Sequence, residues 1–228
     1  MSTVLITGAN RGIGLGLTKH YLRIGAQVTA TYRSPADSEE LLALCGNYDN
    51  LKVRQLEITD YDAVHQLSHE FERLDILINN AGYYGPKGIN FGFTDVEEWR
   101  KVLEVNTIAP LKLVEALYSK MKKSPVKQVA CISSKVGSIT ENTSGGGYIY
   151  RSSKAALNSV VKSLHNDLNE QGFTVLALHP GWVQTRMGGP NALITVSESV
   201  AGLAKVLENV TEKDSGGFYN YDGQPLPW

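Results

Sequence analysis

The chain has 228 residues, of which 42% are hydrophobic and 20% charged, and this balance predicts one ordinary globular domain with a sizeable core. Its formal net charge of -1 points to neither a nucleic-acid partner nor an anionic membrane surface. The two cysteines form no paired motif, no apolar run reaches membrane-spanning length, and the first residues lack the pattern of a signal peptide. We therefore expect a reduced, cytoplasmic protein that does not insert into membranes.

Short apolar segments alternate along the chain with longer amphipathic ones. The predicted strands are Val4–Thr7, Gln27–Thr31, Leu51–Leu56, Asp75–Asn79, Lys127–Ile132, Phe173–His179 and Gly217–Tyr221. The predicted helices are Gly12–Ile24, Ala36–Cys45, Asp60–Phe71, Asp95–Lys122, Tyr148–Glu170 and Ser197–Val210. Strands that are apolar on both faces are typical of a covered parallel sheet. The alternation predicts a single doubly wound α/β domain over residues 1–228, a Rossmann fold with helices on both faces.

A glycine-rich turn follows the first predicted strand and leads into the first predicted helix. It reads Thr7-Gly8-Ala9-Asn10-Arg11-Gly12-Ile13-Gly14, a spacing that differs from the standard Gly-x-Gly-x-x-Gly fingerprint. Glycines let the backbone turn tightly and approach a pyrophosphate, whose charge then lies at the helix N-terminus. The turn predicts dinucleotide binding, and the alternative is a turn that only packs the strand against the helix.

The end of the second predicted strand bears on which dinucleotide binds. An acidic residue at this point binds the ribose 2′-hydroxyl, whereas an arginine accommodates a 2′-phosphate. The segment Thr29–Ser34 contains no carboxylate but does contain Arg33, and Arg11 lies within the glycine turn. Two arginines can bracket a phosphate through charge-assisted hydrogen bonds, although both can also be ordinary surface residues. The pattern favours NADP(H) over NAD(H).

Tyr150 and Lys154 are four residues apart in a predicted helix and therefore share one face. A nearby Lys⁺ favours the phenolate, and acid–base work near neutral pH requires the tyrosine pKa to fall by about 2–3 units from about 10. One lysine in a low-dielectric cleft, helped by a cationic cofactor, could stabilise the phenolate enough to lower the tyrosine pKa by this amount. Taken alone, the spacing occurs by chance on many helices.

Four further motifs appear in the order of a known family. They are Asn79-Asn80-Ala81-Gly82, Asn106 within Glu104–Thr107, Ser133-Ser134, and the segment Pro180-Gly181-Trp182-Val183-Gln184-Thr185. With the glycine turn and the Tyr150/Lys154 pair, they resemble the short-chain dehydrogenase/reductase family over nearly the full length. The segments Gly145–Asn158 and Tyr219–Trp228 are most similar to the sniffer / C-factor carbonyl reductase branch.

This resemblance implies a seven-stranded parallel sheet of order 3-2-1-4-5-6-7 and an NADPH-dependent carbonyl reductase acting on aldehydes or ketones. Tyr150 would be the general acid, and Lys154 would tune it and bind the nicotinamide ribose. Ser134 would hydrogen-bond the substrate oxygen. Asn106 would hold a water in a proton relay. Because the gap between Ser134 and Tyr150 is long, Ser133 and Ser138 remain weaker candidates for the serine role.

The resemblance also implies a set of cofactor contacts. Asn80, Ala81 and Gly82 would line the adenosine ribose, and Val183 and Thr185 would hold the carboxamide. Glu57, at a position that is often Asp in the family, would reach the adenine. The complete predicted set is Gly8, Asn10, Arg11, Gly12, Ile13, Gly14, Arg33, Glu57, Ile58, Asn80, Ala81, Gly82, Tyr150, Lys154, Pro180, Gly181, Val183 and Thr185.

Aromatic and apolar residues after the carboxyl ends of the strands predict an apolar mouth for a small carbonyl or alcohol substrate; they are Tyr83, Tyr84, Phe91, Trp182 and Met187. The family's substrate lid corresponds here to the short segment Arg186–Val196, which predicts an open site with broad acceptance.

Several alternatives stay open. The C-factor resemblance suggests a cofactor-binding signalling protein whose reductase activity is incidental. A sugar-nucleotide epimerase would need a larger C-terminal region than this chain has. His65 and His69 share a helical face, but no third ligand is evident, so no metal is expected. Relatives suggest a homodimer or homotetramer built from the helices around Asp95–Lys122 and Tyr148–Glu170.

Overall fold

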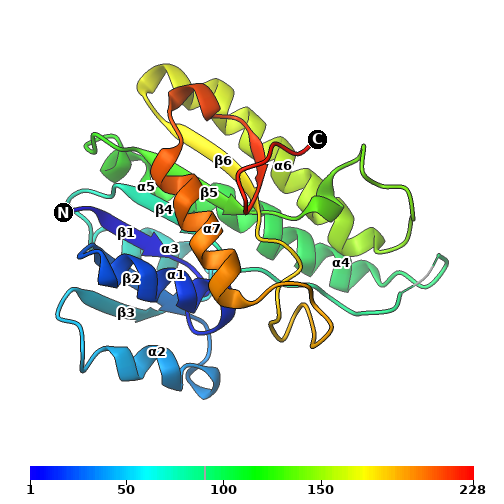
Figure 1. The fold of residues 1–228 in the computed structure, drawn as a ribbon, viewed down its shortest axis with the longest axis horizontal. Coiled ribbons are helices and arrows are strands. Elements are labelled where there is room, and N and C mark those ends of the chain that lie inside the picture. The colour runs from blue at the N-terminus through cyan, green and yellow to red at the C-terminus, as the bar shows by residue number, and fades with distance from the viewer. Residues whose placement is uncertain (90) are drawn as a thin grey trace.

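The computed structural model describes residues 1–89 and 91–228 and contains a seven-stranded parallel sheet (Figure 1). The strand order β3-β2-β1-β4-β5-β6-β7 confirms the predicted topology. The strands are β1 (Thr3–Ile6), β2 (Gln27–Tyr32), β3 (Leu51–Gln55), β4 (Ile76–Asn79), β5 (Gln128–Ile132), β6 (Thr174–His179) and β7 (Phe218–Asn220). The helices are α1 (Gly12–Arg23), α2 (Glu39–Leu44), α3 (Tyr61–Ser68), α4 (Val96–Leu103), α5 (Ala109–Met121), α6 (Tyr148–Leu168) and α7 (Val196–Asn209).

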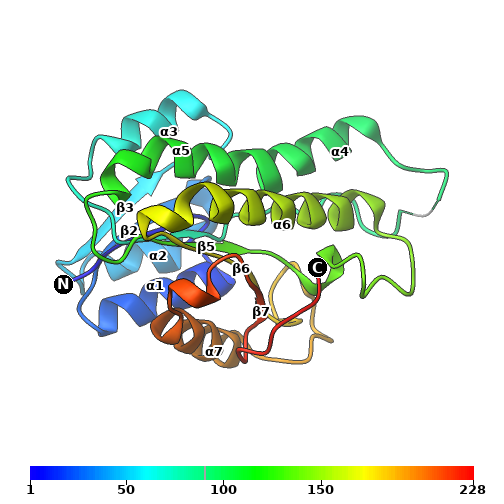
Figure 2. The same ribbon diagram turned by 90° about the horizontal axis from the view of Figure 1, so that it is seen from above.

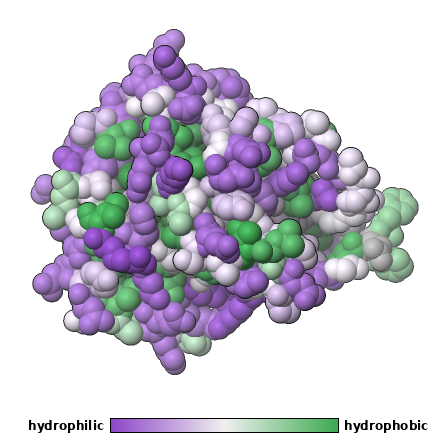
Figure 3. All heavy atoms as spheres, in the orientation of Figure 1, coloured by the Kyte–Doolittle hydropathy of each residue, from purple (hydrophilic) through white to green (hydrophobic). Residues whose placement is uncertain are grey.

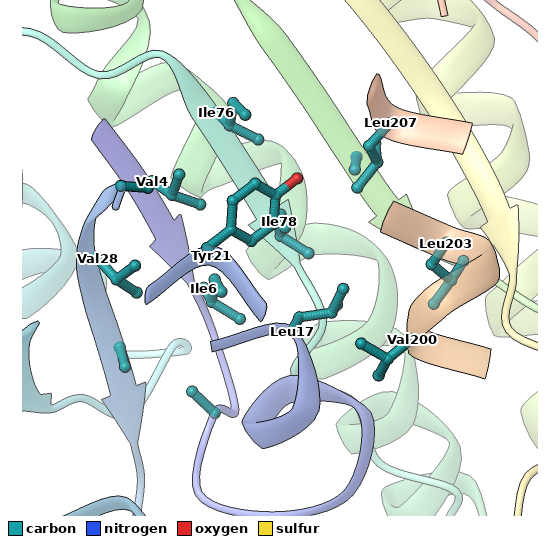
Figure 4. Close-up of a cluster of buried hydrophobic side chains, with 14 of the residues drawn as sticks. Val4, Ile6, Leu17, Tyr21, Val28, Ile76, Ile78, Val200, Leu203 and Leu207 are labelled. Atoms are coloured by element: carbon teal, nitrogen blue, oxygen red, sulfur yellow. The ribbon is translucent and has the colours of Figure 1, made fainter. Parts of the chain in front are cut away.

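The sheet is buried between two layers of helices, as Figure 2 shows from above. Successive residues of a strand point to opposite faces, so an all-apolar strand contributes to two cores. In β1, Val4 and Ile6 pack with α1 and α7, whereas Leu5 packs with α3, α5 and α6. Figure 4 shows the first of these cores, in which Tyr21 and Leu203 lie over the strands. The double-sided burial explains why the central strands β1, β4 and β5 lack an exposed polar face, whereas the edge strand β3 keeps one.

The predicted helix Asp95–Lys122 is interrupted by a π-helical turn, Glu104–Ile108, between α4 and α5. Asn106 lies inside this turn and is fully buried. Its side chain accepts a hydrogen bond from the Tyr83 N–H at 2.8 Å and donates to the Tyr83 carbonyl at 2.8 Å and to Ser153 Oγ at 3.0 Å. These bonds satisfy a buried amide that would otherwise cost about 1–3 kcal/mol. π-Turns inside helices frequently mark functional sites.

The connections that follow β4, β5 and β6 lie at one end of the sheet (Figure 1). The strand order reverses between β1 and β4, which is the point where open parallel sheets bind ligands beyond their carboxyl ends. On the face shown in Figure 3, hydrophilic residues cover most of the surface and apolar residues form small separate groups. Among the described residues, no helix has both the length and the apolar character needed to cross a membrane.

Candidate active site

The glycine turn between β1 and α1 has the shape that its composition predicts. Gly8 and Gly12 adopt φ values of 62° and 53°, in the left-handed region that favours glycine. A Cβ on Gly14 would lie 2.4 Å from the Gly8 carbonyl oxygen and 2.5 Å from Asn80 Nδ2. Asn80 Nδ2 donates to the carbonyl oxygens of Thr7 and Gly8, at 2.8 and 3.0 Å. The Asn80 side chain therefore braces the turn. The Asn80 N–H also donates to Thr7 Oγ1 at 3.1 Å, which leaves the Asn80 carbonyl oxygen for the predicted cofactor contact.

The two arginines predicted to bind a 2′-phosphate lie near a carboxylate that the sequence analysis missed. Asp37 ends a short 3-10 helix, Pro35–Asp37, directly after β2. Its carboxylate lies 3.5 Å from Arg11 Nη1 and 2.6 Å from Nη1 of Arg186, which is 149 residues further along the chain. The hydrogen bond from Arg186, with the charges of Arg186, Arg11 and Arg33, holds the pKa of Asp37 below its usual value. An acidic residue therefore does lie beside the predicted phosphate site.

Two residues after β3, Glu57 and Ile58, were predicted to bind the cofactor, and the side chain of Ile58 is not placed as expected. Glu57 is exposed, and its Oε2 lies 4.0 Å from Arg33 Nε. Ile58 is only 5% exposed and packs into the core beneath α3 with Leu56 and Val64. Its side chain therefore faces away from the predicted adenine site, because neighbouring residues of an extended segment point in opposite directions. Of Ile58, only the backbone remains available to a cofactor.

A cavity of about 660 Å³ lies beyond the carboxyl ends of the central strands. It is bounded by the start of α1, the loops after β4, β5 and β6, and the start of α6. Seven residues predicted for catalysis or cofactor binding line it together: Ile13, Ser134, Tyr150, Pro180, Gly181, Val183 and Thr185. Thr185 also approaches the glycine turn, since a Cβ on Gly12 would lie 3.2 Å from its Cγ2. Residues predicted to bind the cofactor and residues predicted to act in catalysis therefore line the same cavity.

Tyr150 and Lys154 lie one turn apart on α6, and Lys154 is buried beneath the cavity. Lys154 Nζ donates to the Ile132 carbonyl oxygen at 2.8 Å and lies 5.8 Å from the Tyr150 ring centroid. Burial lowers the Lys154 pKa to about 8. Burial, reinforced by Tyr84, raises the pKa of Tyr150. This direction describes the protein without a cofactor, and the lowering of the Tyr150 pKa by Lys154 together with a cationic cofactor stays a prediction.

The three candidate serines differ in how far their hydroxyl groups are already hydrogen-bonded. Ser134 lines the cavity, and its Oγ accepts a weak 3.4 Å hydrogen bond from the Val136 N–H. Ser133 also lines the cavity, but its Oγ donates a 2.6 Å hydrogen bond to Asn158 Oδ1. Ser138 Oγ donates to the Trp228 carbonyl oxygen at 3.1 Å and lies outside the cavity lining. The long gap before Tyr150 therefore leaves Ser134 with the freest hydroxyl at the site.

Three of the five predicted mouth residues line the cavity. Tyr84 stacks on Tyr150 with 4.5 Å between ring centroids, and Trp182 and Met187 line the cavity from the segment after β6. Met187 Sδ lies 3.9 Å from the Tyr150 hydroxyl oxygen, so the short segment after Thr185 reaches the predicted proton donor. The open site with broad acceptance stays a prediction.

Phe91 and Tyr83 lie elsewhere. Phe91 is 83% exposed beside Tyr148, and Tyr83 donates its hydroxyl to Glu98 Oε2 at 2.7 Å. His65 and His69 are in edge-to-face contact on and just after α3, with centroids 4.8 Å apart. Across residues 1–89 and 91–228, no group of three potential metal ligands is brought together.

Comparison with known proteins identifies the family of this site. The family model described as short chain dehydrogenase matches residues 2–193. The chain belongs to the short-chain dehydrogenase/reductase family. C-signal of Myxococcus xanthus is 40% identical to it over 155 residues, which are 68% of this chain and 93% of that protein.

Two solved structures of this family superpose over the whole chain. Carbonyl reductase Sniffer of D. melanogaster has a TM-score of 0.96 and 36% identity, with 100% of both chains covered. The NADPH-bound carbonyl reductase from chicken fatty liver has a TM-score of 0.94 and 37% identity, covering 100% of this chain and 99% of that one. These similarities confirm that this short-chain dehydrogenase/reductase belongs to the sniffer / C-factor branch.

Proposed function

We propose that this short-chain dehydrogenase/reductase is an NADPH-dependent carbonyl reductase that converts aldehydes and ketones to alcohols. The observation that carries the proposal is the shared cavity, in which the Tyr150 hydroxyl and Ser134 face the Pro180–Thr185 segment beside the glycine turn. The cavity and the glycine turn fit a dinucleotide, and Arg11 and Arg33 fit its additional phosphate. The NADPH-bound state of the chicken liver relative supports the same cofactor.

The reaction balances with one hydride and one proton. When bound, NADPH supplies the hydride to the carbonyl carbon. The Tyr150 O–H donates its proton to the carbonyl oxygen, and its raised pKa keeps it protonated for this step at neutral pH. Ser134 Oγ donates a hydrogen bond to the same oxygen as negative charge develops there. The charge left on Tyr150 is stabilised by Lys154.

The remaining predicted residues have supporting roles. Asn106 positions the loop after β4 and the start of α6 through its hydrogen bonds with Tyr83 and Ser153. A Cβ on Gly82 would lie 3.4 Å from Asn106 Oδ1 and 3.8 Å from Lys154 Nζ, so these two side chains approach the same backbone position. This placement beside Lys154 is compatible with the predicted water relay. The cytoplasmic location and the homodimer or homotetramer remain predictions, and light scattering during size-exclusion chromatography tests the latter.

The decisive variant is Tyr150→Phe, which removes only the hydroxyl. We expect NADPH-dependent reduction of a panel of aldehydes and ketones to lose about 10²–10⁴-fold in kcat/KM, because the proton donor is gone. Loss of NADPH absorbance measures the rate, and fluorescence titration checks that NADPH still binds. Near wild-type turnover in this variant would exclude the mechanism.

The similarity to C-signal favours a second candidate, a cofactor-binding signalling protein whose reductase activity is incidental. Such a protein has no need of the Tyr150 hydroxyl. Rescue of a gene deletion by a Tyr150→Phe allele would support this second candidate, whereas failure to rescue would support the reductase.

A further inference from the structure

The mouth of the cavity carries more positive charge than the chain as a whole. Its charged lining residues are Lys87, Lys135, Arg151 and Glu141, so cations outnumber carboxylates by three to one in a chain of net charge -1. Lys135 and Glu141 neutralise each other at 2.9 Å. Lys87 and Arg151 remain, and among the described residues neither has a carboxylate within salt-bridge distance.

Lys87 is held close to the reacting position. Its Nζ donates to the Met187 carbonyl oxygen at 3.0 Å and lies 5.7 Å from the centroid of the Tyr84 ring. The Tyr84 ring in turn stacks on Tyr150, with 4.5 Å between centroids. The ammonium group thus lies one aromatic ring away from the proposed proton donor. One of its three N–H donors is used by Met187, which leaves two for a ligand.

Arg151 supplies a second cation from the α6 side. Its guanidinium donates to the Val136 carbonyl oxygen at 3.3 Å and to Ser144 Oγ at 2.9 Å. A guanidinium has five N–H donors, so these two bonds hold it in place without saturating it. His179 also lines the cavity, but burial lowers its pKa to about 4, and it adds no charge at neutral pH.

We propose, on the basis of the reductase function above, that the substrates are apolar or aromatic carbonyl compounds that carry a carboxylate about one ring away from the carbonyl group. The carbonyl lies at Tyr150 and Ser134, the ring packs against Tyr84 and Trp182, and the carboxylate reaches Lys87. Arg151 adds positive charge to the lining of the same cavity. Unpaired cations beside a low-dielectric wall attract such an anion and disfavour a cationic analogue.

The test compares 4-formylbenzoate with benzaldehyde as substrates for the full-length protein and NADPH. We expect kcat/KM to be at least about 10-fold higher for 4-formylbenzoate, which corresponds to about 1.4 kcal/mol. In Lys87→Gln this ratio should fall about 5-fold or more, and in Lys87→Glu it should fall further. The intrinsic reactivity of each aldehyde cancels when the ratios of variants are compared. Raising the ionic strength should also lower the wild-type ratio, because the proposed attraction is screened by salt.

Lys101→Gln is the matched control. Lys101 lies 5.0 Å over the Tyr83 ring and 4.0 Å from Glu98, outside the cavity lining, so its variant should keep the wild-type ratio. Equal ratios in wild type, Lys87→Gln and Lys87→Glu would overturn the anionic-substrate proposal while leaving the reductase intact. Failure to reduce either aldehyde despite NADPH binding would instead count against the proposed function itself.

Discussion

The chemistry of individual residues depends on burial as much as on identity. Tyr150 and Lys154 have the predicted helical spacing, yet burial raises the pKa of the phenol and lowers that of the ammonium to about 8. Both shifts favour the neutral form, as desolvation does. At neutral pH most of Lys154 is still protonated, so it can stabilise the tyrosinate that forms when Tyr150 gives up its proton.

This lysine predicts a pH dependence of reduction. Below pH 8 Lys154 is charged, and above pH 8 it loses its proton, so kcat should fall as the pH rises through about 8. Tyr150 does not titrate in this range because its pKa is raised. A kcat profile from pH 6 to 10 measures the break. In Lys154→Arg the break should move upward, since arginine stays protonated; an unmoved break would assign it to another group.

The elements around the site are shaped by close contacts between backbones. The first turn of α1 needs glycine at position 14 because a side chain there would meet the Gly8 carbonyl oxygen and the Asn80 side chain. The π-turn contains Asn106, whose buried amide donates to the Tyr83 carbonyl oxygen and to Ser153 Oγ. The helical pattern of Asp95–Lys122 contains both α4 and α5, but it carries no signal for the extra residue in that turn.

The glycine turn gives a prediction with a matched control. Gly14→Ala should weaken NADPH binding at least about 10-fold, because the added methyl group displaces the backbone that approaches the pyrophosphate. Gly46→Ala adds the same methyl group after α2, where the nearest atom lies 4.0 Å away, and should leave the affinity unchanged. Fluorescence titration with NADPH measures both. Equal affinities in the two variants would show that this turn does not hold the cofactor.

At the scale of the whole molecule, the proposed cofactor site joins both halves of the sheet. The turn after β1 and the arginines near β2 belong to one half, whereas Tyr150, Lys154 and the Pro180–Thr185 segment belong to the other. The ion pair between Asp37 and Arg186 also links these halves, although both side chains are exposed and such pairs contribute little stability. A ligand that contacts both halves should therefore stabilise the chain as one unit.

We expect NADPH to raise the melting temperature. At 100 times the dissociation constant a ligand adds about 2.7 kcal/mol, which is about 5–10 °C for a chain of this size. The shift with NADH should be smaller. Arg33→Ala should reduce the NADPH shift but not the NADH shift, and Arg23→Ala, an exposed change at the end of α1, should alter neither. Differential scanning fluorimetry measures all of these, and equal wild-type shifts for both nucleotides would contradict the phosphate-binding role of Arg33.

The order of strands and helices, the glycine turn and the motifs of the site are all legible in the amino-acid sequence. They depend on local patterns, namely the alternation of apolar runs, the conformational freedom of glycine and the spacing of side chains along a helix. These patterns were sufficient to predict the parallel sheet, whereas the roles of Ser134 and Thr185 were implied by the resemblance to the family. The structure places both residues with Tyr150 in one cavity.

Contacts between distant segments could be decided only by the tertiary structure. Asp37 meets Arg186 across 149 residues, and Lys87 meets Met187 across 100. The degree to which Tyr150 is removed from water likewise depends on the loops packed over it. Which residues become neighbours, and which are shielded from water, is decided only when the chain folds. The charge of the cavity mouth and the protonation of Tyr150 therefore follow from the tertiary structure.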